Sequence, residues 1–343
     1  QGPTVTADFS GGDISSDSGL LLVKEFESKL GYFDRMAGCI VDRRNPLQVI
    51  HHLPELIAQR GFGIIAGYED CNDANELRLD PAFRIVAGRS LLNDDFLSSQ
   101  PTLCRFENAV TRWDIKRLMK LQMALFLESF KKAPEKIVLD IDATDDPVHG
   151  QQQLALFHGY YEQYQYYPLI ISSNRHILAS ILRPGTWTHT HGLMTPLRLI
   201  IEDIQKRFPK AKLVIRADSG FSCPGLHELL DKKGCIYYIG VAGNNRLKAQ
   251  SAALEAQVEA SYEATKLKQR EFTHTDYSAA TWTHDRKVII KAEYQEVGPN
   301  TRFVVTNDES RSDEEGYDFY ALRGSSEQWI GELKNGFKGD RLS

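Results

Sequence analysis

Acidic residues end two of the predicted strands, at positions where carboxylates could do chemistry. The segment "IVLDIDAT" places Asp140 and Asp142 at the end of a β-branched run, and "LVIRADSG" places Asp218 at the end of a later one. In open α/β sheets, ligands bind outside the carboxyl ends of the strands. For either strand taken alone, a turn or helix cap remains a second interpretation.

A third carboxylate, Glu327, belongs to the segment "YALRGSSEQWIGELK". On one continuous helix, Tyr320, Glu327 and Lys334 would form a stripe, because residues seven apart return to the same face, with Arg323 one turn from Glu327. A solvated face with a weak Arg–Glu pair is the simpler interpretation. A capping-box spacing in "GSSEQ" offers another boundary, in which the helix begins at Ser326 and the residues before it form a loop.

If Asp142, Asp218 and Glu327 converge, their like charges need a cation. Two such charges ~4 Å apart repel by about 4 kcal/mol at an effective dielectric constant of about 20. Oxygen ligands of this kind suit Mg²⁺ or Mn²⁺ and not Zn²⁺. Two ions at such a site stabilise the attacking and leaving oxygens of a phosphoryl displacement. The sequence therefore predicts that these three residues are catalytic and hold two Mg²⁺ ions, with Mn²⁺ able to substitute.

The spacing Tyr-x2-Arg-x3-Glu-x6-Lys from Tyr320 to Lys334 resembles the signature of bacterial insertion-sequence transposases of the insertion-sequence-four superfamily. "DIDATDD" is similar to the first-aspartate motif of that family and selects Asp142, and "IRADSGF" is similar to the second and selects Asp218. The segments "DATDDPVHGQQ", "GYYEQYQYYPL", "LRPG" and "RGSSEQWIGELK" are most similar to the insertion sequence 1380 family. The resemblance covers nearly the whole chain.

This resemblance implies a DDE metal site and a Mg²⁺-dependent transposase that binds double-stranded DNA, both element ends and target, as a homodimer. Metal-activated water would cleave a phosphodiester, and the freed 3′-hydroxyl would attack target DNA. Tyr320, Arg323 and Lys334 would position phosphates.

The resemblance also implies an α/β fold: an RNase H-like mixed sheet flanked by helices, with a β-rich insertion and an N-terminal helical region. Residues 1–132 read as mainly helical and are expected to bind DNA ends. Residues 133–242 form the first part of the catalytic core, 243–312 the insertion, and 313–343 the part that bears Glu327. The chain has no initiating Met and stops soon after Lys334, so we expect a fragment clipped at both ends.

A second group of candidates is basic. Arg112, Lys116 and Lys120 are spaced by four residues and would line one face of a helix. Two interpretations remain open: a solvated helix face, or a track for DNA phosphates.

Aromatic and histidine residues add further candidates. Trp282 lies in the insertion, where hairpin-forming relatives stack an aromatic ring on a flipped base, although its surroundings also suit a packed strand. His189 and His191 have a spacing found in metal sites, but no third soft ligand accompanies them, which favours a structural pair. His149 near Asp142 suits a substrate contact or a turn equally.

Composition indicates the class of protein and its compartment. The 343 residues carry a net charge of −5, with 42% hydrophobic and 25% charged residues, as in ordinary globular proteins. No apolar run approaches the ~20 residues of a membrane helix, so we expect no membrane association. The five scattered cysteines form no C-x-x-C pair, which favours a reducing cytoplasm. The resemblance implies that this is a bacterial cytoplasm.

Two rival functions share these residues. A metal-free carboxylate-pair hydrolase, such as a glycosidase, would use two of the acids without a cation. A catalytically incomplete transposase remnant would bind DNA without cleaving it.

Overall fold

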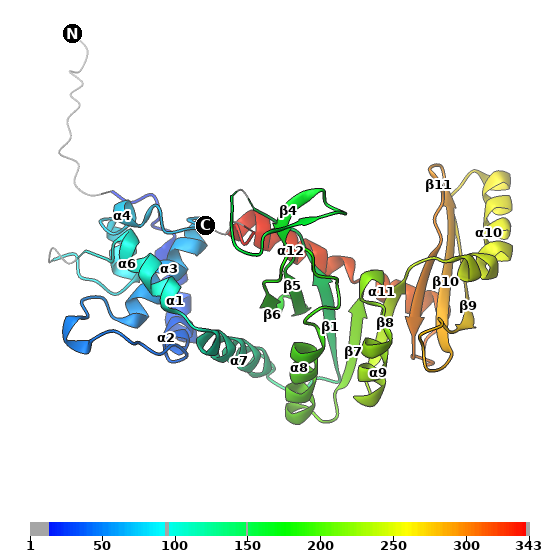
Figure 1. Ribbon diagram of the computed structural model, residues 1–343, viewed down its shortest axis with the longest axis horizontal. Helices are drawn as coiled ribbons and strands as arrows, with labels where there is room; N and C mark the ends of the chain where they lie inside the picture. The colour runs from blue at the N-terminus through cyan, green and yellow to red at the C-terminus, as the bar shows by residue number, and fades with distance from the viewer. Residues whose placement is uncertain (1–13, 93–95, 149, 341–343) are drawn as a thin grey trace, which may run out of the picture. The chain divides into compact units, whose positions relative to one another are not determined.

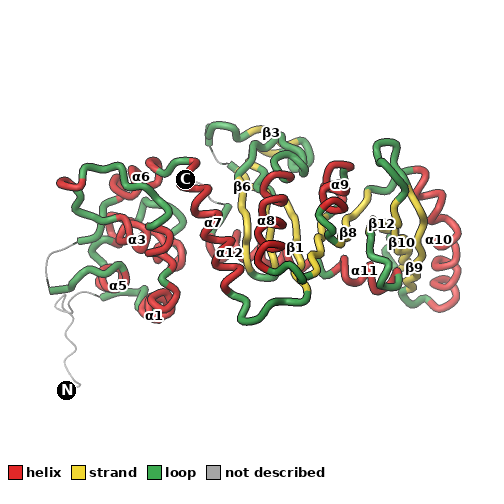
Figure 2. The backbone as a smooth tube through the Cα atoms, turned by 90° about the horizontal axis from the view of Figure 1, so that it is seen from below, coloured by secondary structure: helices red, strands yellow, loops and turns green. Residues whose placement is uncertain are grey.

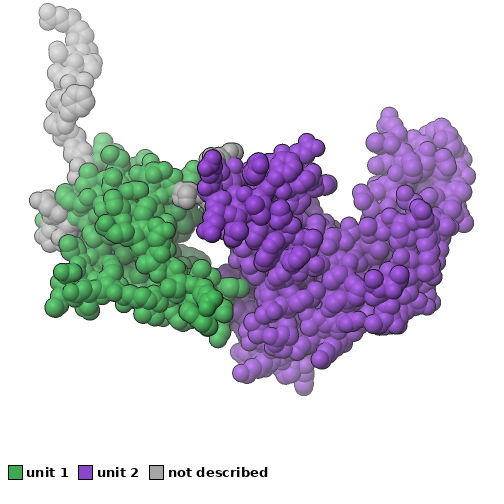
Figure 3. Space-filling model, in the orientation of Figure 1, with its two compact units in different colours: residues 1–121, 332–343 green, residues 122–331 purple. Residues whose placement is uncertain are grey.

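The computed structural model describes residues 14–92, 96–148 and 150–340. The chain divides into two compact units, the first comprising residues 1–121 and 332–343 and the second residues 122–331 (Figure 3). No helix in the described part of the chain is both long and apolar enough to cross a membrane.

The first unit is helical, as predicted for the N-terminal region. Its core contains Phe33, Phe62 and Phe83, and the rings of Phe33 and Phe62 meet edge to face at 5.1 Å. The backbone is extended at Val110, which separates two consecutive helices of this unit. The helices are α1 (Leu20–Leu30), α2 (Tyr32–Ala37), α3 (Leu53–Ala66), α4 (Ala74–Leu77), α5 (Pro81–Val86), α6 (Gln100–Ala109) and α7 (Arg112–Glu128), which continues into the second unit.

The second unit is built on a mixed sheet with the strand order β6–β5–β1–β7–β8 (Figure 1). β1 pairs antiparallel with β5 and parallel with β7, β5 pairs antiparallel with β6, and β7 pairs parallel with β8. This order and these directions are those of an RNase H-like fold, which confirms the predicted fold class. The strands are β1 (Lys136–Ala143), β5 (Leu169–Ser173), β6 (His176–Ile181), β7 (Lys212–Ala217) and β8 (Ile236–Val241).

Hydrophobic strands and amphipathic helices explain this arrangement. Five of the six residues of β7 are buried, as expected for a strand covered on both faces. The connecting helices α8 (Met194–Arg207) and α9 (Pro224–Lys232) bury apolar residues at helical spacing, among them Leu197, Ile201 and Ile204. Figure 2 shows the row of strands and these helices from below.

The β-rich segment extends the same sheet. The strands β9 (Gln269–Tyr277) and β10 (Arg286–Gln295) pair antiparallel, and β10 also pairs with β11 (Gly298–Pro299) and β12 (Arg302–Thr306). β12 then pairs antiparallel with β8, with Val304 opposite Gly240. The long helix α10 (Asn245–Thr265) packs on β9 and β10.

A small second sheet, which the sequence analysis did not predict, interrupts the core between β1 and β5. It consists of β2 (Asp146–Pro147), β3 (Leu156–His158) and β4 (Gln163–Tyr166), in the order β2–β4–β3. The excursion begins after Ala143 and ends at Leu169, and these two residues are partners in the core sheet. Figure 1 shows it beyond the carboxyl end of β1.

The continuous helix from Tyr320 to Lys334, one of the two interpretations of this segment, does not form. The chain forms α11 (Asp313–Ala321), which begins with a capping box between Ser312 and Glu315, and then α12 (Gly324–Phe337). Tyr320 is therefore on the first helix and Arg323 in the turn between the two. The alternative start at Ser326 places the second helix two residues too late.

A buried ion pair fixes α11 to the sheet. Arg216 on β7 donates from Nε and Nη2 to the two carboxylate oxygens of Asp140 on β1, at 2.7 and 2.8 Å. Its Nη1 donates to the backbone oxygen of Phe319 at 2.9 Å. One guanidinium therefore joins two neighbouring strands to the helix that carries Tyr320.

Gly240 allows two segments to approach β8 closely. A Cβ atom at this position would lie 2.7 Å from the hydroxyl oxygen of Tyr320 and 2.8 Å from the backbone nitrogen of Ser219. Only a residue without a side chain fits there.

We predict that Arg216→Met destabilises the chain by about 3–5 kcal/mol, because Asp140 would remain buried without its partner. In the double variant Arg216→Met/Asp140→Leu, part of this loss should be regained, since no unpaired charge remains. Denaturant unfolding of the three proteins measures the difference. A double variant as unstable as the single one would contradict this account.

We predict that Gly240→Ala destabilises the chain by about 1–3 kcal/mol through overpacking. Adding Tyr320→Phe removes the hydroxyl nearest to the new methyl group and should recover part of that loss. If Tyr320→Phe costs the same stability in both backgrounds, the proposed contact is not the cause.

Candidate active site

The two strand-end aspartates are neighbours because β1 and β7 are parallel and in register. Ile141 pairs with Ala217, so the residues that follow them, Asp142 near the end of β1 and Asp218 directly after β7, lie at the same level of adjacent strands. Asp142 is buried, whereas Asp218 begins a short 3-10 helix and accepts a hydrogen bond from the Gly220 amide at 2.8 Å. The local Asp218 cap considered from the sequence is therefore present together with the strand-end position.

Arg323 links the third acid to the first. Its Nη1 lies 3.1 Å from Oδ2 of Asp142, and its Nη2 lies 2.8 Å from Oε1 of Glu327. The guanidinium is mostly buried, whereas the Glu327 side chain is 59% exposed on the first turn of α12. Two of the three predicted ligands thus share one cationic partner.

Tyr320 completes this cluster from α11. Its hydroxyl oxygen lies beside Gly240, which the backbone of Asp218 and Ser219 also approaches. Burial raises the pKa of its hydroxyl, Arg323 lowers it, and the charge of Asp218 raises it again. The phenol is therefore neutral at physiological pH and can donate a hydrogen bond.

The electrostatics of Asp142 reflect its crowded position. Burial raises its pKa from 3.8 to about 6, Arg323 and the Ala143 amide oppose this rise, and the charges of Asp218 and Glu327 add to it. The Ala143 amide donates to Oδ1 at 2.9 Å. The charges of Asp218 and Glu327 therefore both act on the Asp142 carboxyl.

The donor set fits a hard divalent cation, but Arg323 occupies part of the position between the acids. Asp142, Asp218 and Glu327 offer only carboxylate oxygens, which suit Mg²⁺ or Mn²⁺. Among residues 14–92, 96–148 and 150–340, no three Asp, Glu, His or Cys side chains lie close enough together to hold a metal ion. A cation at this site would have to replace the guanidinium as the partner of Asp142 and Glu327.

His189 supports the Asp218 loop, a role that the sequence did not indicate. Its ring would lie 2.4–2.6 Å from a Cβ atom on Gly220, and it packs edge to face on Phe221 at 5.3 Å. Its Nε2 is 2.8 Å from the hydroxyl of Tyr167. Burial lowers the pKa of His189, so a neutral, structural imidazole fits this position. Gly220, which has no side chain, permits this close approach of the imidazole.

Arg183, in the "LRPG" segment, is buried and structural. It donates to the backbone oxygens of Tyr167, His189 and His191 at 2.8, 2.8 and 2.9 Å. His191 contacts the Thr188 hydroxyl at 2.7 Å. The His189–His191 pair therefore stabilises the loop after β6, and His149 lies outside the described residues.

The predicted basic track is on α7. Arg112, Lys116 and Lys120 are exposed. The Arg112 guanidinium and the Lys116 ammonium lie 5.4 and 4.4 Å from the ring centre of Trp113, which is itself half-exposed. Lys334 lies two helical turns beyond Glu327 on α12.

Trp282 lies in the loop between β9 and β10 and is packed. Its ring meets His227 at 4.9 Å and Tyr277 at 5.4 Å, both edge to face. These contacts account for the residue structurally; its predicted role in base stacking remains a prediction.

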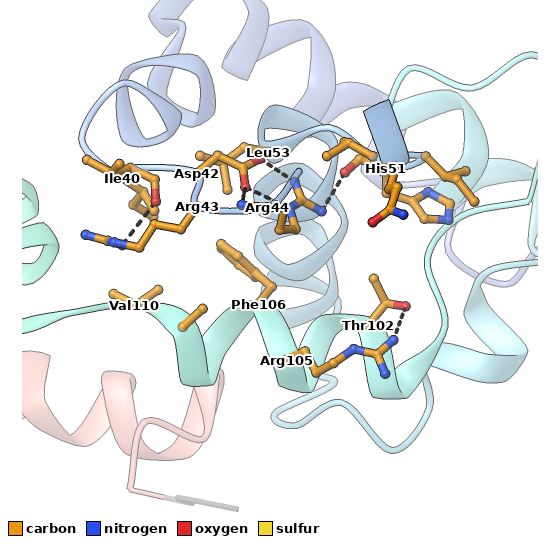
Figure 4. Close-up of a pocket in the computed structure, with 15 residues that line it drawn as sticks. Ile40, Asp42, Arg43, Arg44, His51, Leu53, Thr102, Arg105, Phe106 and Val110 are labelled. Atoms are coloured by element: carbon orange, nitrogen blue, oxygen red, sulfur yellow. Dashed lines mark hydrogen bonds and ion pairs between the residues drawn. The ribbon is translucent and has the colours of Figure 1, made fainter. Parts of the chain in front are cut away.

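A pocket of about 540 Å³ lies in the first unit, between α6 and the loop before α3 (Figure 4). Its lining combines Phe106 and Ile40 with Arg44 and Arg105. Arg44 donates to the Asp42 carboxylate at 2.8 and 2.6 Å, so its charge is already balanced. None of the described residues that line this pocket is a predicted site residue.

We predict that the metal-free chain loses stability relative to Asp142→Asn as the pH rises from about 4 to about 7. Since the folded-state pKa of Asp142 lies above 3.8, the folded chain binds more protons than the unfolded chain in this window. A rise from 3.8 to about 6 corresponds to about 3 kcal/mol. Denaturant unfolding with a chelator, at several pH values, measures the difference between the two proteins. A constant difference would contradict the assignment.

Comparison with known proteins assigns the family. Among solved structures, the chain is similar to a protein described as "Cryo-EM structure of piggyBac transposase synaptic complex with hairpin DNA", with 11% identity, a TM-score of 0.47, and coverage of 91% of this chain and 68% of that one. No curated protein matches. The family model described as "Transposase DDE domain group 1" matches residues 1–343, and the chain therefore belongs to this family of DDE transposases.

Proposed function

We propose that this chain is a transposase that cleaves DNA at the ends of its own insertion sequence and transfers the freed strand to target DNA. The observation that carries the proposal is the linked set of acids, with Asp142 and Asp218 at the ends of adjacent parallel strands and Glu327 joined to Asp142 through Arg323. The insertion sequence 1380 family, on the segments quoted above, is the branch we propose.

Asp142, Asp218 and Glu327 would hold the divalent cation, for which two Mg²⁺ ions or Mn²⁺ are the proposed species. When bound, the metal makes water a strong nucleophile near neutral pH and stabilises charge on the leaving oxygen. The protein itself would position the three carboxylates, two at the carboxyl ends of β1 and β7 and one on the first turn of α12.

The cations around the acids would bind DNA. Arg323 can present its planar guanidinium to a phosphate once it leaves the carboxylates, and Tyr320 can donate its buried hydroxyl. Lys334, on the same helix as Glu327, would contact a phosphate further along the strand.

Recognition of the element ends would involve the exposed face of α7. Arg112, Lys116 and Lys120 offer charge for DNA phosphates, and the half-exposed Trp113 beside them offers a ring. We propose double-stranded DNA as the partner, a homodimer in the DNA complex, and the bacterial cytoplasm as the location. A base-stacking role for Trp282 would require the ring to leave His227 and Tyr277.

We predict that Asp142→Asn and Glu327→Gln each reduce Mg²⁺-dependent cleavage by more than about 100-fold, since even the partners of metal ligands are worth ten- to a hundred-fold. The substrate is a duplex carrying the short inverted repeats that flank the gene. Binding to the same duplex should persist, because neither residue supplies positive charge to the phosphates.

The matched control is Glu332→Gln, which removes an exposed carboxylate from the same helix and should leave cleavage unchanged. Cleavage that survives in Asp142→Asn would overturn the site. Activity that withstands EDTA would favour the metal-free hydrolase, and salt-dependent binding by the wild-type chain without nicking would favour the remnant.

A further inference from the structure

The small β2–β4–β3 sheet carries exposed aromatic rings for which the proposed chemistry has no use. Tyr160, in the turn between β3 and β4, is 84% exposed, and Tyr164 on β4 is 61% exposed. Exposed aromatic rings that gather on one surface mark a candidate binding site, and tyrosine offers both an apolar ring and a polar hydroxyl. These two tyrosines lie on opposite faces of the small sheet, so their contacts are described separately.

Tyr160 is the outer end of a continuous row of rings. Its ring meets Tyr161 edge to face at 5.0 Å, and Tyr161 lies 5.0 Å from His158 and 6.2 Å from Tyr167. Tyr167 in turn bonds His189, which packs against the loop that follows Asp218. We call Tyr160, Tyr161, His158, Tyr167 and His189 the aromatic row.

Tyr164 belongs to the other face of the small sheet. It packs on Phe157 at 5.6 Å, and Phe157 and His158 are consecutive in β3, so their side chains point to opposite faces. Because His158 contacts Tyr161 and Tyr167, the aromatic row lies on the face opposite to Tyr164.

The inner end of the aromatic row lies near the carboxylates of the candidate active site. The excursion that carries it leaves the core sheet one residue after Asp142 and returns at Leu169, opposite Ala143. Burial raises the pKa of Tyr161, and the charges of Asp145, Asp142 and Asp218 raise it further, which agrees with this proximity. Figure 1 shows the small sheet beyond the carboxyl end of β1.

The charge of the excursion is unsuited to a DNA backbone. Residues 144–168 contain Asp145, Asp146 and Glu162 but no Lys or Arg. Phosphates are repelled by such a segment, whereas the flat faces of nucleobases stack on aromatic rings regardless of sequence.

We propose that the exposed end of the aromatic row, Tyr160 with Tyr161, stacks on an unpaired nucleobase of the DNA strand beside the cleaved phosphodiester. This inference rests on the proposed function and names the part of the substrate that this surface binds. A nucleobase at a strand end has lost the neighbouring base on which it stacked. The ring of Tyr160 would take the place of that base. The contact adds affinity without adding positive charge.

The test compares three fluorescent duplexes bound by the full chain in the presence of a chelator. One has a short unpaired thymine overhang, one is blunt, and one carries an overhang of abasic sites. The wild-type chain should bind the thymine overhang more tightly than the other two. Tyr160→Ala should lower this preference roughly 5- to 150-fold, the range found for removing one stacked base.

Two further variants isolate the ring. Tyr160→Phe keeps the stacking face and should retain the preference, and Tyr164→Ala, an equal truncation on the opposite face, should leave it unchanged. The dependence of binding on salt should be the same in all variants, because no phosphate contact is removed.

The inference is overturned if Tyr160→Ala leaves the preference intact, or if the abasic overhang binds as tightly as thymine. It is also overturned if wild-type chain binds and cleaves duplex DNA but shows no preference for an overhang, an outcome that leaves the proposed function standing. A wild-type chain that neither binds nor cleaves any duplex overturns the proposed function itself.

Discussion

The buried pair of Arg216 and Asp140 is the interaction on which the candidate site depends. A paired charge in the interior is tolerated because both groups use several hydrogen-bonding positions at once, and here Arg216 also holds the backbone oxygen of Phe319. This contact fixes α11 next to the strands β1 and β7. The helix then brings Tyr320 and the turn with Arg323 to the carboxyl ends of β1 and β7, where Asp142 and Asp218 lie.

Much of this arrangement could be predicted from the sequence. The β-branched runs ending in aspartate indicated β1 and β7. Because these signals are local, they identified elements correctly. The resemblance distinguished Asp142 from Asp140, and the structure gives a physical reason for the distinction: Asp140 is already engaged by Arg216.

The remaining features depend on contacts between distant segments. In the turn between α11 and α12, Arg323 bonds Asp142, 181 residues earlier in the chain, and helical periodicity cannot reveal such a contact. The small β2–β4–β3 sheet has strands of two to four residues, too short for an alternating pattern to be visible. Gly240 was a weak signal, a glycine inside a buried strand, but the groups that approach it come from elsewhere.

The position of Arg323 has a thermodynamic consequence if the proposed function holds. A single guanidinium cannot serve the carboxylates and a nucleic-acid phosphate at the same time. A cation that takes over the acids therefore frees it for DNA, and DNA that captures it vacates the acids for a cation. By linkage the two ligands must strengthen each other's binding by the same factor. The turn between two helices would thus make the chain cooperative, with the catalytic ions retained most tightly when a substrate is present.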